Sequence, residues 1–148
     1  MKEQLRDLAR GVITQIELNE RLMVETPFDN RVEVEVKGAF TREGKQILLR
    51  FLARAVEDQS CSRCLGDTKF LYEIPYEEVV EMEDIETFDL SEVVRQELQM
   101  AAPLRVLCDE ECLGLCPYCG INLNEATCDC RSEQIDPRLS ALKRLLDE

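Results

Sequence analysis

Eight cysteines constrain the fold of this chain more than any other feature of its sequence. Six of them lie within the segment Cys108–Cys130, and the other two form an upstream Cys-x-x-Cys pair, Cys61 and Cys64. The 148 residues include no histidine, so the zinc ligands of N/S type that the chain offers are the thiolates of cysteine. Two groups of thiols at these spacings predict two zinc sites with four cysteines each.

The cysteines come in four closely spaced pairs, an arrangement in which one loop supplies two ligands to a tetrahedral ion. We assign the first zinc to Cys61, Cys64, Cys108 and Cys112, and the second to Cys116, Cys119, Cys128 and Cys130. Pro117 stiffens the second site, and Gly120 lets backbone N–H groups turn toward the sulfurs. Asn122 and Asn124 suit the tight turns of the same loop.

Two alternatives to this assignment stay open at the level of sequence. Cys112 could belong to the second site, which would leave three thiolates and an open position in the first. The metal could also be iron rather than zinc. With two filled tetrads, no coordination position is left for catalysis, so the zinc ions are expected to be structural.

A redox role is the main competing interpretation, because Cys116-Pro117-Tyr118-Cys119 has the sequence of the glutaredoxin active site. In that fold the motif ends a strand and opens a helix. Here Gly120 and Ile-Asn-Leu-Asn follow, which form helix poorly, and the other cysteines have no place in that fold. We therefore expect no enzyme activity.

The N-terminal segment and the charge of the chain restrict its surroundings and partners. The first residues alternate charges with leucines, without the apolar core of a secretory signal, and no stretch approaches the ~20 apolar residues of a membrane helix. We expect a cytoplasmic protein with no membrane partner, where clustered cysteines bind metal rather than form disulfides. The net charge of −13 argues against wrapping RNA as a whole, but permits a local basic patch or a basic protein partner.

Hydrophobic periodicity predicts an α+β fold. Its body is mainly antiparallel β, a small barrel or sandwich, with a few helices and a C-terminal zinc-knuckle or ribbon segment. Strand patterns occupy residues 12–18, 32–36, 46–56 and 68–74, the last ended by Pro75, and helices cover residues 1–10, a segment capped by Asp89, and a segment that begins at Asp136-Pro137. Cys61 and Cys64 then lie at a hairpin tip, where two sulfurs can be aimed at one point.

The predicted metal sites divide the chain into two parts. Residues 1–112 form a β-rich body with the first zinc site, and residues 113–148 form a small zinc-bound appendage with a C-terminal helix. The first site would cross-link the hairpin tip to the segment after the second helix, over the 43 residues between Cys64 and Cys108. Such a cross-link strongly restricts the unfolded chain.

Residues 73–92 are the most acidic stretch and include no basic residue. They are either a solvated strand edge or a docking face for a basic partner, for which the candidate contacts are Glu77, Glu78 and Glu81. Calcium is disfavoured, because the spacing does not match an EF-hand loop. The candidates for a local RNA contact are Arg63, inside the first Cys-x-x-Cys, and Arg42, Lys45, Arg50 and Arg54, although solubility alone explains these basic residues more simply.

Several longer motifs are more specific than a lone Cys-x-x-Cys. They are Cys61-Ser-Arg-Cys64-Leu, Phe88-Asp-Leu-Ser-Glu, Ala102-Pro-Leu, Gly114-Leu-Cys-Pro-Tyr-Cys-Gly-Ile-Asn-Leu-Asn124 and Asp136-Pro-Arg-Leu139. Together they resemble the YceD family, the bacterial and plastid proteins named for large ribosomal RNA subunit accumulation.

The resemblance implies a non-enzymatic role in accumulation of 23S ribosomal RNA, and so in assembly of the large ribosomal subunit. The expected partner is a ribosomal protein or a precursor large-subunit particle, with a local rRNA contact and no small-molecule substrate. An acidic, zinc-stabilised adaptor that binds proteins outside ribosome assembly is the alternative.

Overall fold

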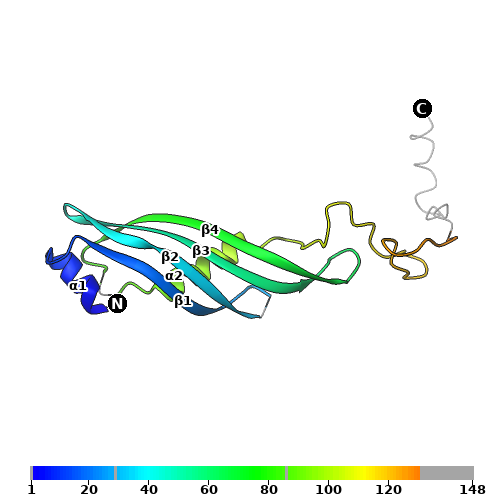
Figure 1. Ribbon diagram of the computed structural model, residues 1–148, viewed down its shortest axis with the longest axis horizontal. Coiled ribbons are helices and arrows are strands. Elements are labelled where there is room, and N and C mark those ends of the chain that lie inside the picture. The colour runs from blue at the N-terminus through cyan, green and yellow to red at the C-terminus, as the bar shows by residue number, and fades with distance from the viewer. Residues whose placement is uncertain (1, 29, 86, 131–148) are drawn as a thin grey trace, which may run out of the picture.

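A computed structural model of the chain describes residues 2–28, 30–85 and 87–130. The molecule is elongated, with a twisted sheet toward one end and the cysteine-rich segment toward the other (Figure 1). Its elements are α1 (Lys2–Arg10), β1 (Gln15–Glu25), β2 (Arg31–Glu43), β3 (Gln46–Ser60), β4 (Asp67–Glu81) and α2 (Leu90–Ala101). The helix predicted from Asp136-Pro137 lies outside the described residues.

The four strands form one antiparallel sheet in the order β1-β2-β3-β4, so each strand pairs with its neighbour in sequence. This confirms the α+β class with an antiparallel body. Within the described residues the sheet is single and open, rather than the small barrel or sandwich that we expected. The reason is that α1 and α2 provide the second layer, since their buried leucines join the core of the sheet.

Strict alternation along the strands selects the face that meets the helices. In β2, Val32, Val34 and Val36 are 7%, 0% and 0% exposed, while Arg31 before them and Glu33 among them face solvent. Burying each valine contributes on the order of 1.5–3 kcal/mol. Along β2 the opposite face carries charged and polar side chains that face solvent, so the two faces of this strand are chemically distinct.

The strands are longer than the patterns predicted. The strand expected at 12–18 begins at Gln15 and continues to Glu25, because exposed residues at 19–21 hide the alternation. Pro75 does not end the last strand, which runs on to Glu81 with Pro75 opposite Leu52. Since β4 is an edge strand, a residue without an N–H is tolerated there.

Two segments carry the chain from the sheet to the cysteine-rich end. The β3–β4 hairpin delivers Cys61–Cys64 at its tip, and the extended segment after α2 runs to Cys108 (Figure 1). Asp89 caps α2 as expected, because its side chain accepts a hydrogen bond from the N–H of Ser91. None of the helices among the described residues is long and apolar enough to cross a membrane.

Candidate metal centre

The hairpin tip and the segment after α2 bring together four thiols, which we call the proximal cluster. Its sulfur atoms, all within 4.8 Å of one another, belong to Cys61, Cys64, Cys108 and Cys112. The sulfurs of Cys61 and Cys112 are 3.8 Å apart, and those of Cys64 and Cys108 are 3.6 Å apart. Four sulfurs at about 2.3 Å from a tetrahedral ion are about 3.8 Å apart, whereas a disulfide needs about 2.05 Å. The arrangement thus fits a metal ion.

The knuckle at the hairpin tip is held by short backbone hydrogen bonds. The N–H of Cys61 donates to the carbonyl of Gly66, and the N–H of Leu65 donates to the carbonyl of Cys61. Leu65 adopts a positive φ of 60°, which closes the turn tightly behind Cys64. From the other segment, the carbonyl of Val106 accepts a hydrogen bond of 2.8 Å from the N–H of Ser62. Backbone hydrogen bonds therefore hold the knuckle against the segment after α2, in addition to the contacts between their cysteine sulfurs.

The thiols of the proximal cluster differ in acidity. Hydrogen bonds from the backbone N–H groups of Cys64 and Cys108 lower the pKa of Cys61 to about 6. The neighbouring sulfurs, that of Cys112 above all, raise the pKa of Cys108 to about 12. One thiolate is thus stabilised by the backbone, but further thiolates repel it unless a cation lies among them. A cation bound among these four sulfurs would therefore stabilise their thiolate forms.

The remaining four cysteines form a second group, the distal cluster. Its sulfur atoms, also within 4.8 Å of one another, belong to Cys116, Cys119, Cys128 and Cys130. The structure thus gathers the eight thiols in the two groups that the spacing indicated, with Cys112 among the proximal sulfurs. That these groups ligate a metal stays a prediction.

The distal cluster repeats the chemistry of the proximal one. The N–H of Cys116 donates to the carbonyl of Ile121, and its carbonyl accepts from the N–H of Gly120, whose φ is +74°. Backbone N–H groups of Cys119 and Tyr118 lower the pKa of Cys116 to about 6. The sulfur of Cys119 is the main cause that raises the pKa of Cys130 to about 12.

Arg63, predicted as a partner contact, is engaged within the molecule. Its Nη1 donates hydrogen bonds to the carbonyls of Cys112 (2.8 Å) and Glu110 (3.2 Å). Its own carbonyl accepts a bond of 3.1 Å from the N–H of Leu115. Arg63 therefore ties the knuckle to the segment that links the two clusters, a role that the sequence did not indicate.

The predicted acidic docking residues do not share one face. Alternation along β4 places Glu77 and Glu81 on the outer face of the sheet and Glu78 on the face that carries Tyr76 and the helices. Glu77 pairs with Arg50 at 2.8 Å, which lowers the pKa of Glu77. Glu81 accepts a hydrogen bond of 2.8 Å from Gln46, and Glu78 accepts one from the hydroxyl of Tyr76.

Most of the basic residues that we considered for RNA are also paired within the molecule. Arg50 pairs with Glu77, and Arg54 pairs with Glu73 at 2.6 Å. Arg42 donates to the carbonyls of Leu8 and Ala9 at the C-terminal end of α1, where it stabilises the helix end. Lys45 lies in the turn between β2 and β3.

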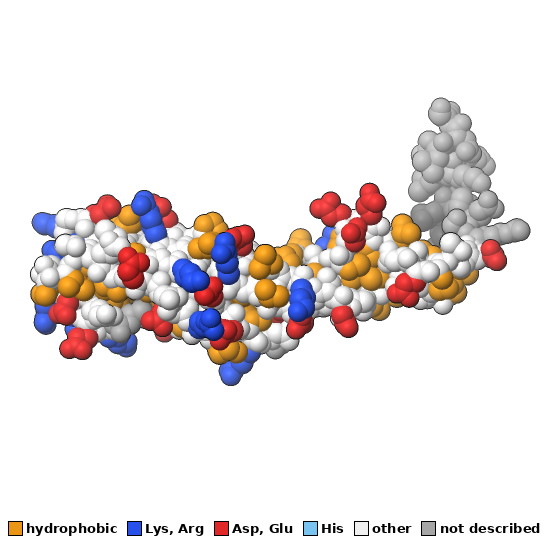
Figure 2. Space-filling view, viewed as in Figure 1, with side chains coloured by type: hydrophobic (Ala, Val, Ile, Leu, Met, Phe, Trp, Pro, Cys, Tyr) orange, Lys and Arg blue, Asp and Glu red, His pale blue; other side chains and the backbone are white. Residues whose placement is uncertain are grey.

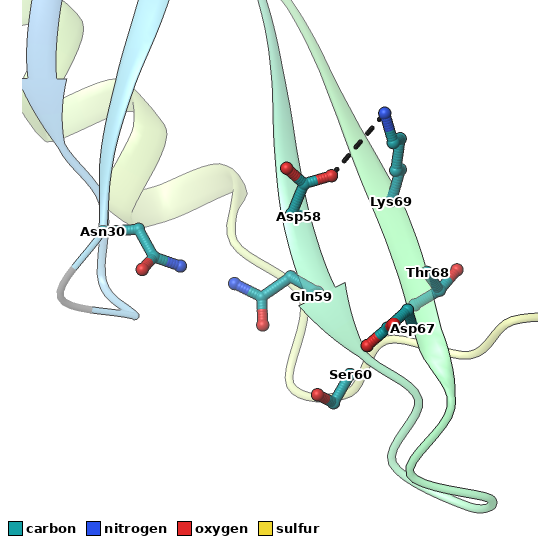
Figure 3. Close-up of a pocket in the computed structure, with 7 residues that line it drawn as sticks. All are labelled: Asn30, Asp58, Gln59, Ser60, Asp67, Thr68 and Lys69. Carbon is teal, nitrogen blue, oxygen red and sulfur yellow. Dashed lines mark ion pairs between the residues drawn. The ribbon is translucent and has the colours of Figure 1, made fainter.

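A polar cavity of about 560 Å³ lies beside the hairpin rather than at either cluster (Figure 3). It is lined by Asn30, Asp58, Gln59, Ser60, Asp67, Thr68 and Lys69. Asp58 and Lys69 form an ion pair across the two strands, and the side chains of Asn30 and Gln59 face each other. Amides, hydroxyls and one ion pair bring no activated nucleophile to this cavity.

Comparisons with known proteins identify one matching family and several relatives. Residues 73–146 match the family described as large ribosomal RNA subunit accumulation protein YceD. The chain is 27% identical to the uncharacterized protein YlbN of Bacillus subtilis, over 90% of this chain and 86% of that protein. It is also 31% identical to large ribosomal RNA subunit accumulation protein YCED homolog 1, chloroplastic, of Arabidopsis thaliana, over 44% of this chain.

The matched segments differ in extent between these relatives. The chain spans only 20% of the Arabidopsis protein. A 30% identical relative, the uncharacterized protein Rv2926c of Mycobacterium tuberculosis, is matched over 58% of this chain and 49% of its own length. No solved structure matches the chain significantly.

Proposed function

The chain belongs to the YceD family of large ribosomal RNA subunit accumulation proteins, and from this premise we propose that it promotes accumulation of 23S ribosomal RNA during large-subunit assembly. It does so as a cytoplasmic, non-enzymatic factor with two structural zinc ions. Its partner is a ribosomal protein or a precursor large-subunit particle.

The observation that carries the zinc part of this proposal is the gathering of eight thiols into two groups of four. The residues that would hold the ions are those of the proximal and distal clusters. Zinc bound by four thiolates has no free coordination position, and it supplies a cross-link rather than a reactive group. Here it would join the hairpin tip to the segment after α2 and close the loop that follows.

The charge distribution supports a basic partner more than extensive contact with RNA. The chain carries 31 acidic and 18 basic residues, and the exposed Asp109, Glu110 and Glu111 lie beside the proximal cluster. Figure 2 shows one face of the molecule. Lys and Arg side chains (blue) lie over the sheet and at its junction with the cysteine-rich end. Beyond that junction the coloured side chains are acidic (red) or hydrophobic (orange). Ribosomal proteins are basic, so an acidic factor can bind one before RNA does.

Removal of the protein from its own cells tests the proposal. We expect 23S rRNA to fall relative to 16S rRNA and to recover with the wild-type protein. The Cys61→Ser variant, which removes a buried sulfur of the proximal cluster, should not restore it. Met100→Ala, at an 81% exposed side chain, serves as the matched control and should restore it fully. Unchanged 23S rRNA in cells without the protein would contradict the proposal.

The second candidate is an acidic, zinc-stabilised adaptor outside ribosome assembly, favoured by the exposed glutamates of β4. Charge reversal at Glu77, Glu78 and Glu81 separates the two candidates. Loss of 23S rRNA accumulation on reversal supports the ribosomal role. Normal accumulation together with loss of a different bound protein supports the adaptor.

A further inference from the structure

Asn124 links the two cysteine clusters through its side chain. It lies in the loop between Cys119 and Cys128, which both belong to the distal cluster. Its Nδ2 is nevertheless 3.3 Å from the sulfur of Cys112, a member of the proximal cluster. The loop that carries distal ligands therefore also supplies a hydrogen-bond donor to a proximal sulfur.

The neighbouring backbone determines which way the Asn124 amide points. The N–H of Leu113 lies 2.8 Å from Oδ1 of Asn124. A backbone N–H can only donate, so the oxygen of the amide must face Leu113 and the NH₂ group must face Cys112. One side chain thus fixes the backbone just after Cys112 and donates to its sulfur.

Asn124 is held in place by the fold of its own loop. Its backbone N–H and its Nδ2 are 3.1 and 2.8 Å from Oδ1 of Asn122. The N–H of Leu123 donates to the carbonyl of Gly114, and Asn122 pairs with Leu115 in an isolated bridge. Anything that orders the loop between the distal ligands also orders Asn124.

Donors of this kind change how well a thiolate binds a metal. An N–H directed at a ligating sulfur disperses its charge and fixes its orientation, and loss of such a partner typically weakens metal affinity by about 10–100-fold. Cys112 is a sulfur at which such a donor matters. Its side chain is 4% exposed, so little water can reach the sulfur and replace the hydrogen bond from the Asn124 amide.

We propose that Asn124 is a positioning residue that couples the two clusters, so that zinc in the distal cluster raises the affinity of the proximal cluster for zinc. This inference rests on the proposed binding of zinc by both clusters. Because coupling between two binding sites is reciprocal, zinc in the proximal cluster raises the distal affinity by the same factor. We expect that factor to be about 10-fold or more.

The experiment measures zinc affinity of the proximal cluster in the reduced, full-length protein. Free Zn²⁺ is buffered with a chelator, and proximal occupancy is followed by the amide NMR signals of Arg63 and Gly66. Four proteins form a cycle: wild type, Cys128→Ser, Asn124→Asp, and the protein with both changes. Asn124→Asp keeps an oxygen for Leu113 but turns a second oxygen toward the sulfur of Cys112.

Coupling predicts that Cys128→Ser alone weakens the proximal cluster by about 10-fold or more, and that Asn124→Asp alone does the same. In the protein with both changes, the zinc affinity of the proximal cluster should equal that of Asn124→Asp alone. Ala126→Asp is the matched control, since it adds the same charge to the same loop at an exposed side chain that makes no hydrogen bond to Asn124. It should leave proximal affinity within about twofold of wild type.

Two results would overturn the proposal, and they differ in what they say of the proposed function. If proximal affinity is the same in all four proteins and both clusters of the wild type bind zinc, the coupling is refuted but the zinc sites remain. Failure of the wild-type protein to bind zinc refutes both the coupling and the proposed zinc sites. If Asn124→Asp lowers the dispersion of the sheet signals, Asn124→Ala replaces it, because it deletes both hydrogen bonds without adding charge.

Discussion

At the scale of single residues, Glu57 is a buried acidic side chain outside the clusters. It is 1% exposed, yet three neighbours satisfy its carboxylate: Thr26 at 2.5 Å, Asn30 at 3.0 Å and Tyr72 at 2.9 Å. Burial and the adjacent carboxylate both raise the pKa of Tyr72, so its hydroxyl stays a donor. Glu57 thus fastens the β1–β2 turn to β4 just before the hairpin reaches the proximal cluster.

Replacement of Glu57 tests this polar junction. Glu57→Ala leaves buried hydroxyl donors without an acceptor and should lower the free energy of unfolding by about 3 kcal/mol. Asp58→Asn, at the next residue, changes an exposed ion pair with Lys69 and should cost less than about 0.5 kcal/mol. Urea unfolding followed by circular dichroism measures both values. Equal losses would show that Glu57 has no special role.

The acidity of the thiols predicts how zinc binding depends on pH. The raised pKa values of Cys64 and Cys108 keep these thiols protonated at pH 7, as do those of Cys128 and Cys130 in the distal cluster. Thiolates bind the metal, so each zinc should displace at least two protons, and affinity should fall as pH falls. Calorimetry in buffers of different ionisation enthalpy counts these protons. Release of none would contradict the assignment of four thiolates per ion.

At the scale of elements, the sheet owes its shape to a close approach between β2 and β3. A Cβ atom added at Gly38 would lie 2.0 Å from the carbonyl oxygen of Arg50 and 2.6 Å from Cα of Phe51. Both are backbone atoms, which cannot move aside independently. The ring of Phe51 stacks on Tyr76 of β4, with centroids 4.6 Å apart. The absent side chain therefore lets three strands pack closely at this level.

Gly38→Ala should destabilise the sheet by about 2–3 kcal/mol, because it forces the two strands apart. Gly44→Asn is the matched control: its position has a φ of +64° that asparagine tolerates, and no atom lies within 4 Å of an added Cβ. The control should change the free energy of unfolding by less than about 1 kcal/mol. Thermal melts with similar midpoints for both variants would contradict the close approach.

Sequence patterns predicted the elements that depend on local chemistry. The alternation at Val32–Val36 predicted a strand, Asp89 predicted the start of α2, and the short spacings of the cysteines predicted their two groups. In each case the residues that carry the signal are within a few positions of one another. The period or spacing then has a direct geometric meaning.

The contacts that the sequence did not predict join distant parts of the chain. Arg63 and Cys112 are 49 residues apart, and Glu57 and Thr26 are 31 apart. Pro75 looked like a strand end because only the order of the strands shows that β4 lies at an edge. Asn124 looked like an ordinary turn residue, since its bond to Cys112 depends on how two loops pack. Tertiary placement, rather than residue type, decides all of these roles.

At the scale of the whole molecule, the described residues contain two separate hydrophobic cores. The larger lies between the sheet and the helices and includes no cysteine, whereas the smaller comprises Cys61, Cys64 and Cys112 with Leu107 and Leu115 packed against them. The two cores support independent stability for the sheet and the cysteine-rich end. The division of the chain at residue 112 stays a proposal.

Removal of metal should therefore affect the two ends of the molecule differently. With a strong chelator and a reductant, we expect hydrogen exchange at residues 61–66 and 105–125 to rise by at least about 10-fold. Exchange in β2 and β3 should rise much less, because the sheet core includes no cysteine and loses only the restriction that the cross-link places on the unfolded chain. Loss of protection throughout the sheet would contradict the separation of the two cores.

Metal content decides directly whether the two cysteine clusters hold zinc. Elemental analysis of the purified, reduced full-length protein, combined with a thiol count, should give two zinc ions per chain and no thiol that reacts before a chelator is added. All eight cysteines should become reactive once the metal is removed. One zinc per chain would break the assignment of two tetrads, and eight freely reactive thiols with no metal would contradict the zinc sites altogether.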